Sequence, residues 1–143
     1  MYNIFKHSHS GLMWLIVAFL ILSVLLSLLS LIKKDDAFAS KFMKIYGITR
    51  WLLYIQFIFG AILYFISPMV SFESGFMKNA DLRFTAIEHP IMMLVVIGFV
   101  SMGLFKSKKK ATAVLKSKTI LIFYAIALVI AVTMIPWKAV MAA

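Results

Sequence analysis

Cysteine is absent from this chain, and acidic residues are few. Without cysteine the protein has no disulfide, no thiolate metal site and no cysteine nucleophile. Only 5 residues are aspartate or glutamate, against 15 that are lysine or arginine, and charged residues make up 14% of the chain. Hydrophobic residues make up 64%. A water-soluble domain of 143 residues needs far more polar surface, so the composition predicts a small integral membrane protein.

Four apolar runs are each long enough to cross about 30 Å of hydrocarbon, which takes about 20 helical residues. The third run reaches this length only if its helix continues back past Pro90, which brings Glu88 and His89 into the helix or its first turn. The first run is too long for the core of a signal peptide and ends in the charged group KKDD, so we expect it to be retained. The sequence thus predicts an all-α integral membrane four-helix bundle, a single transmembrane domain over residues 1–143, with helices at about 8–32, 47–68, 84–105 and 118–137.

Basic residues are concentrated in two connections between the apolar runs. Five lie in 33–50 and six in 106–118, which leaves four of the 15 elsewhere. Loops rich in lysine and arginine stay in the cytoplasm, so both connections are predicted to be cytoplasmic and the N and C termini to be outside. The net charge of +10 therefore indicates the lipid bilayer, with its anionic headgroups, and no nucleic acid as the partner.

Small and weakly polar residues predict which helix faces pack together, because such residues favour helix association in lipid. Gln56 lies well inside the hydrocarbon, where an unpaired amide is costly, so we expect it to have a polar partner on a neighbouring helix. The expected inward faces are Ser23, Ser27 and Ser30 in the first helix, Gln56, Gly60, Leu63 and Ser67 in the second, His89, Val96, Val100 and Gly103 in the third, and Tyr124, Ala127, Ala131 and Met134 in the fourth.

The chain has three histidines, His7, His9 and His89, and all of them fall on the predicted outer side. His9 continues the serine stripe of the first helix in steps of three and four residues. His7 is turned from it by about 200°. If one of the pair faces the bundle, His9 is the better candidate. An alternative remains open, in which interfacial histidines only bind water, headgroups or loop carbonyls.

Two imidazoles from different helices at one end of a four-helix bundle can hold a haem iron axially. His9 and His89 are therefore candidate axial ligands of haem iron. Glu88 and Arg83 are candidate supporting residues, since Glu88 can pair with Arg83 or orient a histidine on another helix. Counting from the cytoplasmic helix ends at 1.5 Å per residue places His9 about 6 Å outside the hydrocarbon and His89 about 4 Å within it.

Four short motifs occur in a distinctive order: HSHSGLMW at 7–14, ISP at 66–68, LRFTAIEHP at 82–90 and IPW at 135–137. Together they resemble a family of small bacterial four-helix membrane proteins labelled cytochrome b-like, over nearly the whole chain. The resemblance implies haem b as the cofactor, His9 and His89 as matched motif positions, and a multi-pass location in the bacterial inner (cytoplasmic) membrane. Family members often carry another histidine in the second helix, near Tyr54-Ile55-Gln56. This chain has none, which argues against a second haem.

The leading functional hypothesis is a membrane haem b-binding electron-transfer protein with its site near the outer face and a quinone as redox partner. The alternative is a non-catalytic accessory or structural subunit of a larger membrane complex, which the short loops favour. A transporter is disfavoured because charges across the bilayer interior are missing. An independent enzyme is not expected, because the sequence offers no nucleophile–base pair and no phosphate-binding glycine loop.

Overall fold

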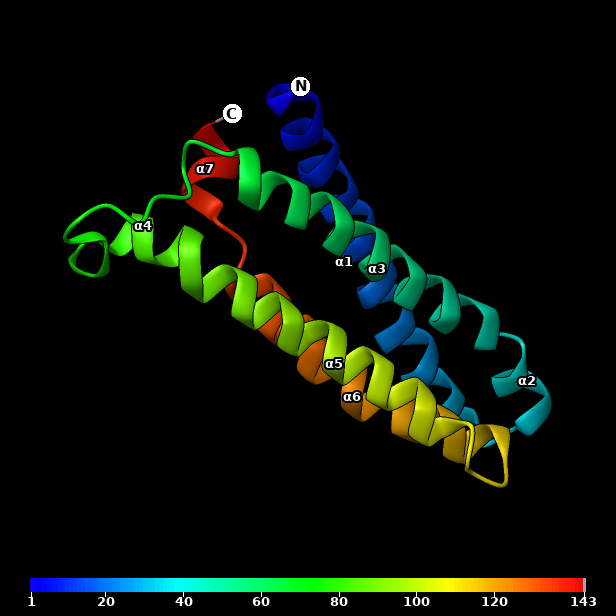
Figure 1. Ribbon diagram of the computed structural model, residues 1–143. Helices are drawn as coiled ribbons and strands as arrows, with labels where there is room; N and C mark the ends of the chain where they lie inside the picture. The colour runs from blue at the N-terminus through cyan, green and yellow to red at the C-terminus, as the bar shows by residue number, and fades with distance from the viewer. Residues whose placement is uncertain (143) are drawn as a thin grey trace.

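The computed structural model describes residues 1–142, and the regular structure within them is helical throughout. Four helical segments there are long and apolar enough to cross a membrane, and they pack as a bundle (Figure 1). They are α1 (Tyr2–Lys33), α3 (Met43–Ile66), α5 (His89–Ser107) with the turns before it, and α6 (Ala113–Thr133). The predicted all-α four-helix architecture is confirmed. Shorter elements are α2 (Asp36–Ser40), a 3-10 turn at Phe76–Lys78, α4 (Ala80–Arg83), a π-helical turn at Phe84–Glu88 and α7 (Trp137–Ala142).

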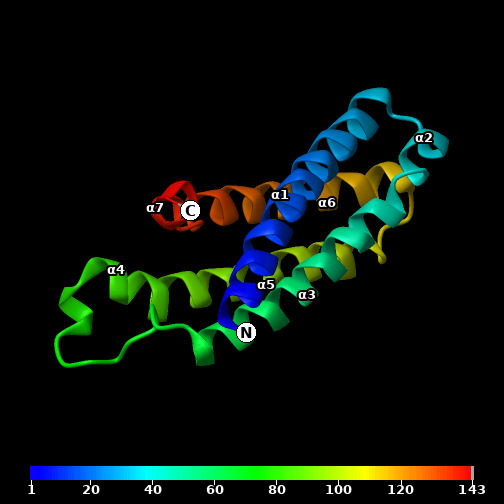
Figure 2. The same cartoon turned by 90° about the horizontal axis from the view of Figure 1, so that it is seen from above.

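The bundle has a small core and a broad apolar surface. Helix α1 packs on α3 and on α6, α5 packs on α6, and α3 and α5 share a smaller contact. Helix α1 runs obliquely across the other helices (Figures 1 and 2). Outward-facing side chains are large, apolar and exposed, as a chain surrounded by lipid requires. Fully buried side chains at the helix crossings include Leu20, Val96, Val100, Ile120 and Tyr124, and exposed ones include Leu25, Ile58, Phe65, Leu94 and Val129.

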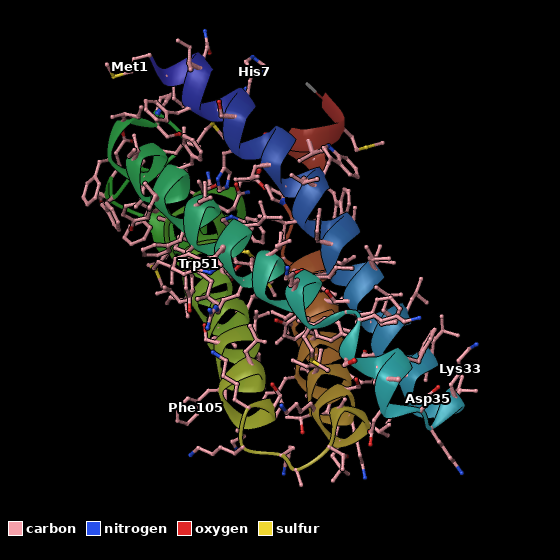
Figure 3. The ribbon with its side chains drawn as sticks, turned by 90° about the vertical axis from the view of Figure 1, so that its right-hand side faces the viewer. Met1, His7, Lys33, Asp35, Trp51 and Phe105 are labelled. Atoms are coloured by element: carbon pink, nitrogen blue, oxygen red, sulfur yellow. The ribbon has the colours of Figure 1, made fainter. Side chains whose placement is uncertain are left out.

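Both chain ends lie at the same end of the bundle. We call this the histidine end, because it carries His7, His9 and His89, and it also carries the 67–79 connection (Figures 1 and 3). The opposite end carries the connections 34–42 and 108–112, and we call it the basic end. The predicted arrangement, with both termini on one side, agrees with this topology. The side of the membrane that each end faces stays a prediction.

Several helices of the structure begin or end a few residues away from the approximate bounds expected from the apolar runs. Helix α1 begins at Tyr2 rather than near residue 8, α3 covers 43–66 rather than 47–68, the third span begins at Ala80 rather than 84 and continues to Ser107, and α6 covers 113–133 rather than 118–137. Hydropathy marks only the part of a helix that crosses hydrocarbon, whereas helix starts and ends are fixed by capping groups.

Side-chain caps and one proline account for three of the observed ends. The Thr112 hydroxyl accepts a hydrogen bond from the backbone N–H of Leu115 and so starts α6 outside the apolar run. Asn79 caps the third span in the same way, through the N–H groups of Asp81 and Leu82. Helix α3 ends before Ser67, which is extended (ψ 132°) because the ring of the following proline disfavours a helical residue there.

Candidate histidine site

The third span passes Pro90 without leaving its helical path, as the sequence predicted. Proline has no N–H, and its ring crowds the carbonyl four residues earlier, here that of Ala86. The π-helical turn at Phe84–Glu88 accommodates the proline, and the His89 N–H donates to the Phe84 carbonyl across it. From α3, the Tyr64 hydroxyl donates to the Ala86 carbonyl at 2.9 Å. The carbonyl that the proline leaves free is therefore satisfied by a neighbouring helix.

The imidazoles of His9 in α1 and His89 in α5 lie next to each other at the histidine end. Their ring centroids are 6.4 Å apart, and the ring planes are 80° apart. Both side chains are partly buried, whereas His7 is exposed at the end of the bundle (Figure 3). The two candidate ligands therefore come together, and His7 stays apart from them.

The depth mismatch predicted for these two histidines was wrong. That count assumed four upright, regular α-helices of equal tilt. Helix α1 is oblique to its neighbours (Figure 2). The tilt of α1 changes the level at which the His9 side chain lies, and hydropathy does not record tilt.

The hydrogen bond made by His89 determines which of its nitrogens is free. The Nδ1 atom is 2.8 Å from the backbone carbonyl oxygen of Met134, just beyond the end of α6. A carbonyl only accepts, so Nδ1 carries the proton and donates it, and Nε2 keeps its lone pair. This is the support that a metal-bound histidine needs, with one ring nitrogen held by a backbone carbonyl and the other available to the metal.

Helix α3 contacts both the backbone and the ring of His9. The Gln56 side-chain amide donates to the backbone carbonyl of His9 at 2.8 Å, which confirms the expected polar partner for Gln56. One turn further on, a Cβ atom added to Gly60 would lie 3.1 Å from Cε1 of the His9 ring. Among the described residues, His9 Nδ1 and Gln56 Oε1 are both buried without a hydrogen-bond partner. Two polar atoms of the contact between α1 and α3 are thus left without a hydrogen bond among the described residues.

Arg83 and Glu88 form an ion pair beside the histidines. Arg83 Nε lies 3.0 Å from Glu88 Oε1, and Arg83 Nη1 donates to the Met77 carbonyl at 2.9 Å. Of the two roles expected for Glu88, pairing with Arg83 is the one observed. His89 is oriented by the backbone carbonyl of Met134. The ion pair ties the 67–79 connection to the start of α5.

The donor set of this site is limited to two imidazoles. No group of three or more histidine, aspartate or glutamate side chains within residues 1–142 is placed to hold a metal ion. Zinc sites in proteins use three or four such ligands. Two imidazoles on different helices instead suit an iron whose remaining positions are filled by a porphyrin.

The fold and its lipid-facing surface define a small multi-pass membrane protein with four spans. In comparisons with protein-family models, with curated proteins and with solved structures, nothing matches this chain. The geometry of the histidine pair is therefore the basis for a functional assignment.

Proposed function

We propose that this protein is a membrane haem b protein of the bacterial cytoplasmic membrane that transfers electrons at its histidine end. The 6.4 Å separation between the ring centroids of His9 and His89 carries the proposal. Two imidazoles bound on opposite sides of one metal ion, each at about 2 Å from the metal, have centroids about 6 Å apart. Rotation of either ring about its metal–nitrogen bond leaves that distance unchanged, so the 80° between the planes is compatible with it.

The residues around the pair fit such a group. Nε2 of His89 keeps its lone pair for a metal, because the Met134 carbonyl holds its Nδ1–H. Gly60 leaves space for the His9 ring, and the Gln56 amide fixes the backbone of His9. Lys6 and Lys138 are exposed at the same end and supply positive charge for carboxylate substituents.

A bound haem supplies one-electron chemistry that the side chains of this chain lack. The chain itself holds two neutral imidazoles in fixed orientations and keeps them partly buried in the bundle. Its position in the bilayer makes a quinone, or a larger membrane complex, the electron-transfer partner in this proposal.

The test is an absorption spectrum of the purified full-length chain after addition of haemin. His9→Ala and His89→Ala are expected to remove a low-spin spectrum, whereas His7→Ala leaves it intact, because only His7 lies outside the site. Added imidazole should restore the low-spin spectrum of His89→Gly, which separates the loss of a ligand from a loss of folding.

A chain that binds no added haemin, and so stays colourless once unbound haemin is removed, contradicts the proposal. In that case the non-catalytic accessory subunit becomes the better account, and a larger membrane complex should co-purify with the chain. A haem that survives the loss of His89 overturns the ligand assignment alone.

A further inference from the structure

Arg50 lies on α3 about two helical turns inside the basic end, within a membrane-crossing segment. Its side chain is partly buried, and its Nε atom is buried with no hydrogen-bond partner among the residues that the structure describes. Within residues 1–142 the ion pair observed is the one between Arg83 and Glu88, at the other end of the bundle. Arg50 therefore has no carboxylate counter-ion in this part of the chain.

Two aromatic rings partly stabilise this cation. The guanidinium carbon lies 5.5 Å from the ring centroid of Trp51 and 5.9 Å from that of Tyr54. Such contacts are worth only about 0.5–2 kcal/mol each, and they satisfy none of the five N–H donors of a guanidinium. Charged side chains in membrane segments are costly and are found paired. An anionic ligand would supply such a partner.

An apolar groove begins at Tyr54, about one helical turn along α3 from Arg50. It has a volume of about 320 Å³, lies between α3 and α5, and is lined by Tyr54, Phe57, Ile58, Leu94 and Ile97. Tyr54 belongs to both features, because its ring also contacts the guanidinium. Its hydroxyl bonds to Ser101 on α5 at 2.7 Å, which leaves only the apolar part of Tyr54 toward the groove. An anion on Arg50 would thus sit at one end of a strip of hydrocarbon.

The order of these features along α3 matches one class of molecule. Arg50 and Ile58 are separated by about 12 Å along the helix, at about 1.5 Å per residue, which is a large part of an acyl-chain length. The cationic end of the strip is the end that faces the lysine-rich connections, including Lys106 and Lys109. A phospholipid of that leaflet carries its phosphate at the level of these lysines and its acyl chains toward the membrane centre.

We propose that the seam between α3 and α5 binds an anionic phospholipid of the leaflet at the basic end, with its phosphate on Arg50 and an acyl chain in the groove. The guanidinium gives the phosphate two parallel N–H donors, a geometry that lysine does not provide. This site does not involve His9 or His89, so it stands or falls independently of haem binding.

The experiment is a native mass spectrometry titration of the full chain in detergent. Phosphatidylglycerol is compared with phosphatidylcholine of the same acyl chains. We expect phosphatidylglycerol to bind more tightly, and Arg50→Gln to weaken its binding by at least about fivefold, since a basic side chain near an anionic lipid contributes about 1 kcal/mol. Lys44→Gln is the matched control. It removes the same charge from an exposed position of α3 and should change binding less than twofold or so.

Two further variants keep the test decisive if Arg50→Gln fails to fold. Arg50→Lys retains the charge but loses the planar fork, and should bind more weakly than the wild type. Ile97→Trp fills the groove from α5 without altering Arg50, and should also weaken phosphatidylglycerol binding. Equal affinity for the two lipids would overturn the proposal. Equal losses of phosphatidylglycerol affinity in Arg50→Gln and Lys44→Gln would also overturn it, because they would mean that the lipid is attracted by diffuse positive charge. Unchanged binding in Ile97→Trp would overturn it as well, because it would mean that no acyl chain occupies the groove.

Discussion

Replacing Gly60 by alanine tests the contact between α3 and His9. The added Cβ would lie 3.1 Å from His9 Cε1, where 3.4–4 Å is an ordinary contact, so the ring must move by a few tenths of an ångström. Alanine stabilises a helix by about 0.5–1 kcal/mol relative to glycine. Overpacking at a well-filled contact costs about 1–3 kcal/mol. The free energy of unfolding of Gly60→Ala should therefore fall by up to about 2 kcal/mol relative to wild type.

Gly98→Ala is the matched control on α5. A Cβ at Gly98 meets no atom within 4 Å, so this variant should keep the helix-forming gain without the overpacking cost. The assay is thermal unfolding in one detergent, followed by circular dichroism, with the haemin-loaded spectrum of each variant as a second readout. Equal stability of the two variants, with equal spectra, would show that the His9 ring does not lie against Gly60.

Other predictions concern single hydrogen bonds and the topology. Tyr124→Phe removes a 2.6 Å hydrogen bond to the Tyr46 carbonyl and should cost about 1 kcal/mol of stability. Tyr46→Phe removes a buried hydroxyl that makes no hydrogen bond within residues 1–142, and should cost less. The opposite order in thermal unfolding would contradict this. Tyr64→Phe should lower stability by about 1–3 kcal/mol, because the Ala86 carbonyl loses its donor. An unchanged melting temperature would mean that another donor replaces it. Reporters active only in the cytoplasm should work in the 33–46 and 106–118 connections and fail at the C-terminus. The reverse pattern would invert the topology.

Helical periodicity predicted the inward faces well. Ser23, Ser27 and Ser30 are fully buried, and extending their stripe outward correctly selected His9 over His7. Helices in lipid pack through the faces whose side chains allow close approach. The sequence of each single helix is enough to identify that face. The polar partner of Gln56 followed from the cost of an unpaired amide in hydrocarbon.

The contacts that position the histidines could not be predicted in the same way. The partner of His89 is a backbone carbonyl of Met134, and a backbone group at a helix end has no sequence signature of its own. The relative levels of His9 and His89 depend on helix tilt, which hydropathy does not record. One signal was available. Pro90 implies a free carbonyl at Ala86, and hence a donor from a neighbouring helix, which is Tyr64.

The most direct test of the account is the electron paramagnetic resonance spectrum of the full chain loaded with haemin in its ferric form. Two axial imidazoles with planes 80° apart predict a low-spin signal with the strong anisotropy of nearly perpendicular ligands, from one haem per chain. A spectrum that contains only high-spin ferric haem, or only unbound haemin, would contradict the assignment of His9 and His89 as a haem-binding pair.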